Sequence, residues 1–222
     1  MASADTLSVA NLLLLADGRF PDGSHAHSSG MEAAVAAGRV HDPSSLHGYV
    51  TARLWTTTRT DAAVAALAAR GDHALDDLDR ALTMRQPGRA AREASRSLGR
   101  SLVRTAARLW PGREPRLGDG RPPLQPVALG AVAALSGCGP REAALCTTHA
   151  SAAGLSSAAL RLLGLDPFAV AGVLADLRDP VAAVAESVLD LSGPADLPSA
   201  STPLAELDPE LQRTIEPRLF GS

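Results

Sequence analysis

The sequence contains no lysine, so arginine accounts for all 21 of its Lys and Arg residues. This absence excludes a Schiff-base lysine and a phosphate-binding loop of the G-x-x-x-x-G-K-[ST] type. The only two cysteines, Cys138 and Cys146, are too few for a disulfide framework. Aromatic residues make up 3% of the chain and Ile215 is the only isoleucine, so a core must be built from Ala, Leu and Val.

Membrane and export signals are also missing from the sequence. No apolar run reaches the ~18 residues that a membrane helix needs. The start, MASADTLSVANLLLL, lacks the basic region of a signal peptide. The formal charge of −3 gives no global attraction to nucleic acid. We therefore expect a cytoplasmic protein that binds neither membranes nor nucleic acid.

The abundance of Ala and Leu predicts an all-α fold, because both residues favour helices and no stretch alternates long enough for a strand. We expect a single helical-bundle-like domain over residues 1–222, with short helices and flexible N- and C-terminal segments. Its body would span about residues 1–190. Residues 191–222 are rich in proline, which predicts an extended or disordered tail. The tail would end in a helix that docks on the body or on another chain, with an apolar face of Leu211, Ile215, Leu219 and Phe220.

Charge is distributed unevenly along the chain. Ten arginines lie between residues 85 and 121, and ten acidic residues lie between 166 and 216. Five arginines in the basic region are spaced four apart, which places them in a slow spiral on one helix. We call this set the arginine row: Arg92, Arg96, Arg100, Arg104 and Arg108. Such a row is either a solvated face or a docking surface for an acidic partner or for the acidic part of the same fold.

A loop with two closely spaced histidines, FPDGSHAHSSGMEAA, covers residues 20–34 and is called the histidine loop below. In an extended chain the side chains of His25 and His27 would point the same way. Imidazole pairs bind Ni, Zn and Cu, but a strong site needs three or four ligands, and only Asp22 lies close by. A transient metal contact, simple loop packing and a partner surface all remain possible interpretations.

A second candidate constellation combines Cys146 with His149. On a helix that starts near Pro140 these residues are i, i+3 neighbours. Thiolate and imidazole can bind a soft metal or form a nucleophile pair, whereas a buried free cysteine is usually inert. The chain has no G-x-S-x-G, H-E-x-x-H or C-x-x-C motif. We therefore expect a binding protein, with a helical enzyme based on this cysteine as an alternative.

The segment RFPDGSHAHSSGMEAAVAAGRV resembles the N-terminal signature of the UreF family of urease accessory proteins. His25 stands where many relatives carry Phe or Tyr. The segments AAREASRSLGRSLVR, VALGAVAALSGCGPREAA, SSAALRLLGLDP and PRLFGS are similar to later family motifs in the same order, whereas LQPVALG lacks a histidine that relatives often carry. The positions that fall on the signature are Pro21, Gly23, Ser24, His27, Ser28, Gly30, Met31 and Glu32.

The resemblance implies an all-helical homodimer that takes part in nickel insertion during urease maturation. It would bridge a UreG-type GTPase and a UreD/UreH-type subunit, and the complex would deliver nickel to the urease apoprotein in a GTP-dependent step. The chain itself would be no enzyme and would bind no cofactor stably, with nickel only in transit. His25 and His27 would make a transient nickel contact; the alternative is a stand-alone nickel metallochaperone that uses the same two residues. The expected partner-binding residues are Pro21, Gly23, Ser24, His25, His27, Ser28, Gly30 and Glu32 in the loop, Arg96, Arg100 and Arg104 in the row, and Arg218, Leu219 and Phe220 at the C-terminal end.

Overall fold

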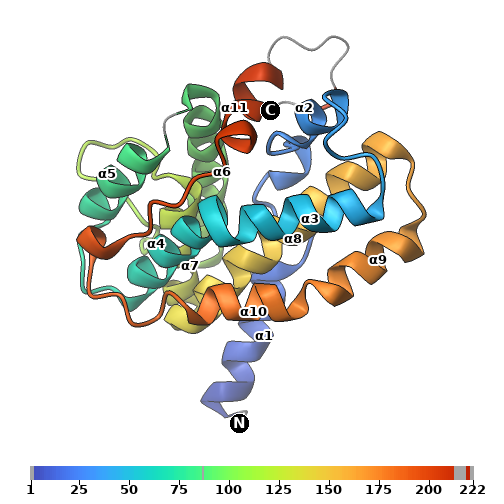
Figure 1. Cartoon of the computed structure of the whole chain (residues 1–222). Helices are drawn as coiled ribbons and strands as arrows, with labels where there is room; N and C mark the ends of the chain where they lie inside the picture. Colours follow the sequence, from blue (N-terminus) through green and yellow to red (C-terminus); the bar gives the residue numbers. More distant parts are fainter. Residues whose placement is uncertain (1–2, 87, 213–218, 221–222) are drawn as a thin grey trace.

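The structure is a computed structural model that describes residues 3–86, 88–212 and 219–220. Every regular element among these residues is helical, so the predicted all-α fold is confirmed (Figure 1). No helix in this described part combines the length and the apolar character needed to cross a bilayer. The α-helices in chain order are α1 (Ala4–Ala16), α2 (Met31–Ala36), α3 (Pro43–Arg53), α4 (Arg59–Arg70), α5 (Leu75–Arg85), α6 (Arg89–Leu109), α7 (Gln125–Ser136), α8 (Pro140–Leu163), α9 (Pro167–Asp176), α10 (Arg178–Glu186) and α11 (Pro203–Gln212).

Helices α3 and α4 form one continuous rod, because the five residues between them make a π-helical turn, η2 (Leu54–Thr58). The rod begins with local signals in the sequence. The carboxylate of Asp42 accepts a hydrogen bond of 2.7 Å from Ser45 N, and Pro43 occupies the first helical position, where no N–H is needed. Two further single turns, η1 (Ser24–Ala26) and η3 (Pro194–Asp196), are of the 3₁₀ type.

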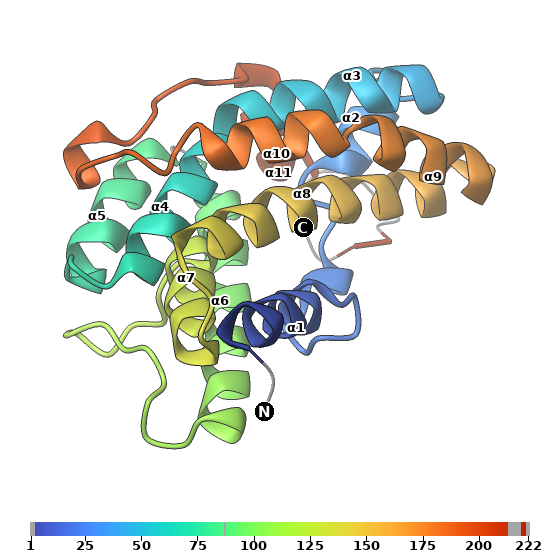
Figure 2. The same cartoon turned by 90° about the horizontal axis from the view of Figure 1, so that it is seen from below.

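The core depends on small residues that let helices approach closely. Helix α8 runs through the middle of the molecule, with α3, α9 and α10 on one side and α1 and α7 on the other (Figure 2). Where α7 crosses α4, a Cβ atom on Gly130 would collide with the carbonyl oxygen of Ala65, so only glycine fits there. Buried alanines of α4 between Ala62 and Ala68 complete this contact. A core built from Ala, Leu and Val is therefore what the structure contains.

Arg96 ties α6 to α5 and is not part of an exposed surface. Its guanidinium pairs with both carboxylate oxygens of Asp79 at 2.6 Å, and the two side chains are 17% and 3% exposed. Asp79 also accepts a hydrogen bond of 2.8 Å from Leu124 N, and Arg96 donates one of 2.8 Å to Pro122 O. Asp79 and the chain's own backbone therefore occupy donors of Arg96, and its expected contact with a partner stays a prediction.

The C-terminal segment, residues 191–220, packs on the body in its described part. It runs from α10 past α5 and α4 to α11 (Figure 1). Arg70 Nη1 donates to Leu191 O at 2.7 Å, and Thr60 Oγ1 donates to Pro198 O at 3.1 Å. The prediction of an extended or disordered tail is wrong for residues 203–212. Pro203 begins α11 at a position that needs no N–H, and the carboxylate of Glu206 accepts a hydrogen bond from Thr202 N.

Candidate functional site

The histidine loop turns twice, at glycines with left-handed backbone conformations. The φ angles of Gly23 and Gly30 are +85° and +88°, a region that favours glycine. Between them, Ser24–Ala26 form the 3₁₀ turn η1, so His25 and His27 do not lie in an extended chain. The prediction that their side chains point the same way assumed an extended chain, which this turn is not. The side chain of His25 is exposed and that of His27 is half-buried.

The inner half of the loop is covered by the chain's own C-terminal segment. Ser28 Oγ donates to Gln212 Oε1 at 2.8 Å, and Gln212 Nε2 donates to Glu32 Oε2 at 2.9 Å. Leu219 N donates to Glu32 Oε1 at 2.8 Å. Ser28, Glu32 and Gln212 are all buried. These contacts explain the spacing of the polar loop residues without any second protein.

Gly30 is the point of closest approach between the loop and α11. A Cβ atom on Gly30 would lie 2.7 Å from Asp208 Cβ and 3.3 Å from Pro209 Cδ, so a larger residue would push α11 away. The partner contacts expected for Ser28, Gly30 and Glu32 stay a prediction. In this structure their partner is α11 and the end of the same chain.

Asp208 is the anchor of α11, and its side chain is fully buried. Its carboxylate forms an ion pair with the guanidinium of Arg39 and accepts a hydrogen bond of 3.0 Å from Tyr49 Oη. Burial, as the largest cause, raises the pKa of Tyr49 to about 12, so this phenol stays protonated as the donor. The acidic C-terminal region thus docks on the body through a specific buried carboxylate.

The last described residues also pack on the body. Phe220 is buried in the cluster that includes α8 and α9, and the guanidinium of Arg161 lies 4.4 Å from the centroid of its ring. In this structure the ring of Phe220 is buried in the chain's own core, and its expected partner contact stays a prediction. Leu219 is 72% exposed and stays available as a contact residue. Arg218, which was expected to act with them, and Ile215 of the expected terminal helix lie outside the described residues.

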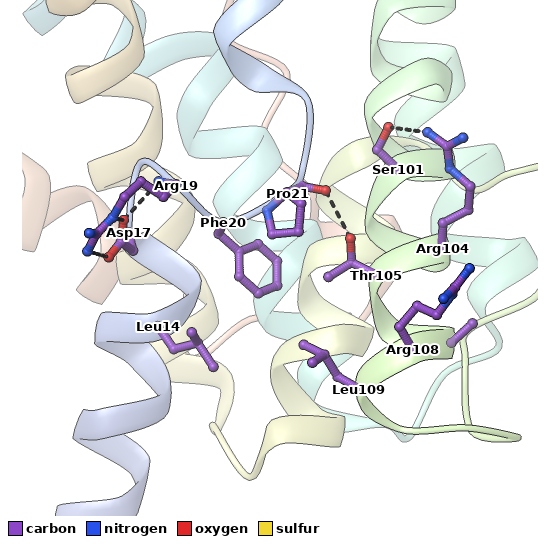
Figure 3. A pocket seen from close by; sticks show the side chains of 11 residues that line it. Leu14, Asp17, Arg19, Phe20, Pro21, Ser101, Arg104, Thr105, Arg108 and Leu109 are labelled. Carbon is purple, nitrogen blue, oxygen red and sulfur yellow. Dashed lines mark hydrogen bonds and ion pairs between the residues drawn. The ribbon is translucent and has the colours of Figure 1, made fainter.

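The outer half of the histidine loop borders an open groove of about 800 Å³ between α1 and α6. Figure 3 shows Phe20 and Pro21 between the two helices, with Leu14 on one side and Leu109 on the other. Thr105 Oγ1 donates to Pro21 O at 2.9 Å and fixes the loop to α6. The groove is lined by Leu14, Asp17, Arg19, Phe20, Pro21, Ser101, Arg104, Thr105, Ala107, Arg108 and Leu109.

The groove brings the histidine loop and the arginine row together. Arg104 and Arg108 line its α6 side, and neither forms an ion pair with any described residue (Figure 3). Arg19, in contrast, pairs with Asp17 at 2.7 Å, and this hydrogen-bonded pair holds the pKa of Asp17 below its ordinary value. Arg100 is exposed on the same helix, one turn before Arg104. An apolar floor beside uncompensated arginines suits a segment with both apolar and acidic side chains.

The histidines alone do not form a multidentate metal site. Within the described part of the chain, no three His, Cys, Asp or Glu side chains are grouped so that they could hold a metal ion. Burial lowers the pKa of His27, against a weaker opposite effect of Asp22. This shift favours the neutral form of the His27 imidazole at pH 7.

The pair of Cys146 and His149 does not form an activated nucleophile. Cys146 is 1% exposed and lies in a core cluster, whereas His149 is exposed. Burial, with smaller contributions from Cys138 and Asp22, raises the pKa of the Cys146 thiol to about 12. The thiol is protonated at neutral pH, so the interpretation as an inert buried cysteine is favoured over the enzyme alternative.

Helix α11 shows a feature that the sequence interpretation missed. Its buried residues are Ala205, Asp208, Pro209 and Gln212. Its leucines face outward, with exposed fractions of 65% for Leu204, 53% for Leu207 and 51% for Leu211. We call these three residues the leucine face. The i, i+3, i+7 spacing of these leucines is typical of one face of a helix. The prolines in the same segment had instead predicted an extended chain.

Comparison with known proteins identifies the family. A family model described as UreF matches residues 40–178 of the 222. The chain belongs to the UreF family. It is 44% identical over 191 residues to a urease accessory protein UreF from Mycobacterium sp. (strain JLS), a match that covers 84% of this chain and 90% of that one. It is 46% identical over 193 residues to the protein of the same name from Mycobacterium tuberculosis (strain ATCC 25618 / H37Rv), with the same coverage.

The range that the UreF family model matches does not include the histidine loop. The matched residues begin at Val40, after the histidine loop, so the family assignment does not depend on the loop motif that first indicated it. Three of the other segments that resemble the family, at residues 90–104, 127–144 and 156–167, lie inside the matched range. The arginine row and the whole rod of α3 and α4 lie inside the matched range.

Proposed function

We propose that this chain is an assembly factor for the urease nickel centre and bridges a UreG-type GTPase and a UreD/UreH-type subunit. The supporting observation is that different elements of one chain present two surfaces of different chemistry. One is the basic-edged apolar groove between α1 and α6, and the other is the leucine face of α11. Two such surfaces suit a protein that holds two partners at once.

We assign the groove to the GTPase, because its exposed arginines and apolar floor favour an acidic, partly apolar segment. The test is co-purification of the GTPase with the variant Arg104→Glu, Arg108→Glu. Charge reversal should reduce capture at least ~10-fold, since like charges across an interface are repulsive. The matched control is Arg80→Glu, Arg113→Glu, which makes the same charge change at exposed residues outside the groove. Equal capture by both variants and wild type would rule out the groove as the GTPase site.

We assign the leucine face to the UreD/UreH-type subunit. The test variant is Leu204→Asn, Leu207→Asn, which removes exposed apolar area without touching the buried contacts of α11. It should lose the subunit and keep the melting temperature of the wild type. The control is Leu7→Asn, Leu13→Asn on α1, where the leucines are 53% and 67% exposed. If the control variant loses the subunit and the test variant keeps it, the interface with the subunit lies on α1 and not on α11.

Nickel is the cargo of this proposal, and His25 and His27 are its transient contact. The variant His25→Ala, His27→Ala should assemble with both partners and yield urease apoprotein that carries less nickel. Equilibrium dialysis of the lone chain with nickel tests the stand-alone metallochaperone, which requires tight stoichiometric binding. The proposal also includes a homodimer, and sedimentation equilibrium of the lone chain measures this directly.

A further inference from the structure

A second cavity, of about 370 Å³, lies between the body and the C-terminal segment, away from the groove. Its walls come from the end of α3, the π-helical turn η2, α4, α5, the start of α6 and the C-terminal segment. We call it the polar cavity. The lining residues are Arg53, Thr57, Thr60, Asp61, Leu82, Met84, Arg85, Gln86, Gly88, Ala91, Ser199, Ala200, Ser201, Ala205, Glu206 and Pro209.

The polar cavity concentrates side-chain atoms that lack hydrogen-bond partners. Seven buried side-chain N or O atoms among the described residues have none, and four of them belong to residues that line this cavity. Buried polar groups are normally satisfied, because an unpaired one costs about 1–3 kcal/mol. The four atoms are Arg53 Nε, Thr57 Oγ1, Arg85 Nε and Gln86 Oε1.

The donor set is suited to an anion. Two of the four atoms are guanidinium N–H donors, and the Thr57 hydroxyl can donate a third hydrogen bond. The charged side chains in the lining are Arg53, Asp61, Arg85 and Glu206. Of the two carboxylates, Glu206 already accepts a hydrogen bond of 3.1 Å from Thr202 N, and Asp61 accepts one of 3.3 Å from Gln86 Nε2.

We propose that the polar cavity is a binding site for a small oxyanion, a carboxylate or a phosphate-like group, held by the guanidinium groups of Arg53 and Arg85. A volume of about 370 Å³ is within the range of small-molecule sites. Guanidinium donors match carboxylate and phosphate oxygens in geometry and charge. The π-helical turn that supplies Thr57 is an element often found at functional sites.

The charge state of Asp61 sets the pH dependence of this site. Burial, only partly offset by Arg53 and by the Gln86 hydrogen bond, raises the pKa of Asp61 to about 7. Below that pH the lining carries one negative charge fewer, and above it the Asp61 carboxylate competes with the ligand for the arginines. Anion affinity should therefore fall as the pH rises from 6 to 8.

The bound anion would also join two parts of the chain. Arg53 Nη1 donates to Ala205 O at 3.1 Å, so the same guanidinium contacts the C-terminal segment and lines the cavity. Because residues 199–201 form part of the wall, occupancy should protect them from proteolysis. This gives a second readout that does not depend on partner binding or on urease activity.

The test is isothermal titration of the full chain with sulfate and, separately, with acetate, whose charges do not change between pH 6 and 8. Saturable one-site binding of either anion at pH 6 supports the proposal, and the tighter probe identifies a tetrahedral or a planar ligand. Arg85→Gln should weaken binding about tenfold or more, while Arg80→Gln on the same helix should not. Asp61→Asn should bind equally at pH 6 and pH 8.

A second variant covers the case in which Arg85→Gln does not fold. Thr57→Val keeps the shape of the side chain and removes one donor, so it should weaken binding severalfold in a folded protein. Absence of saturable binding of both anions to the wild type would overturn the proposal. Binding that is equal in wild type, Arg85→Gln and Thr57→Val would show an adventitious surface site and overturn it as well.

Discussion

The buried carboxylate of Asp208 should decide whether α11 stays on the body. Replacing it with asparagine keeps the size of the side chain and removes the charge that pairs with Arg39. Tyr49 Oη can still donate a hydrogen bond to the amide oxygen, so the main loss is the ion pair. We expect Asp208→Asn to release α11 and the residues after it, while the helical body stays folded.

The size of this effect follows from the burial of the two partners. Removing one member of a buried ion pair costs about 3–5 kcal/mol. The side chain of Asp208 is 0% exposed but that of Arg39 is 26% exposed, so water can solvate the guanidinium once it is unpaired. We therefore expect a cost at or just below the lower limit of this range, about 2–3 kcal/mol. Because 1.4 kcal/mol is tenfold, the open state of the C-terminal segment should become about 30–150 times more populated.

Native-state hydrogen exchange resolves this opening from global unfolding. Amides of α11 should exchange about 30–150 times faster in Asp208→Asn, and those of α8 should keep their wild-type rates. The matched control is Asp190→Asn, which removes an exposed carboxylate from the body. If α11 exchanges at the same rate in the variant and in wild type, Asp208 does not hold this helix, and the reasoning from burial is wrong.

Three further predictions concern other buried groups. Cys146 should resist alkylation at pH 8 until the chain unfolds, because it is buried with a pKa raised to about 12, and rapid labelling of folded protein would contradict this. Asp79→Ala should lower global stability by about 3–5 kcal/mol in urea titrations, because Arg96 is left buried without its carboxylate; an unchanged midpoint would argue against this anchor. The pKa of Asp61 is raised from its ordinary 3.8 to about 7, so between these pH values the folded state binds a proton that the unfolded state does not. Stability should therefore fall as pH rises from about 4 to about 7 and level off above, with a smaller slope in Asp61→Asn.

Local signals in the sequence predicted the parts of the fold that depend on neighbours in the chain. The richness in Ala and Leu predicted helices throughout, and α3 begins at the local signal formed by Asp42 and Pro43. The same local rules failed for α11, because Pro203 and Pro209 count as helix breakers. In the structure Pro203 occupies the first position of the helix, and Pro209 packs on Gly30 from a distant part of the chain. Helix propensity describes only neighbours in the sequence, so it does not predict a contact between distant segments.

The candidate site was predicted in its parts and not in its arrangement. Spacing identified the arginine row, but nothing local distinguishes Arg96, which Asp79 neutralises, from Arg104, which lines the groove. The difference depends on which side of α6 faces α5. The sequence motif likewise singled out the histidine loop, but the division of the loop into a covered inner half and an open outer half depends on the position of the C-terminal segment.

This division changes how substitutions in the loop should be interpreted. A change at Ser28, Gly30 or Glu32 first disturbs the docking of α11, so a lost partner would report on the chain's own fold. Gly23→Arg has a related problem, because its φ of +85° disfavours any larger residue and a Cβ atom would lie 3.4 Å from Ser101 Oγ. Arg104 is exposed and makes only one long side-chain hydrogen bond, of 3.3 Å, to Ser101 among the described residues. Its replacement leaves the backbone of the loop in place, so a loss of binding there reports on the groove itself.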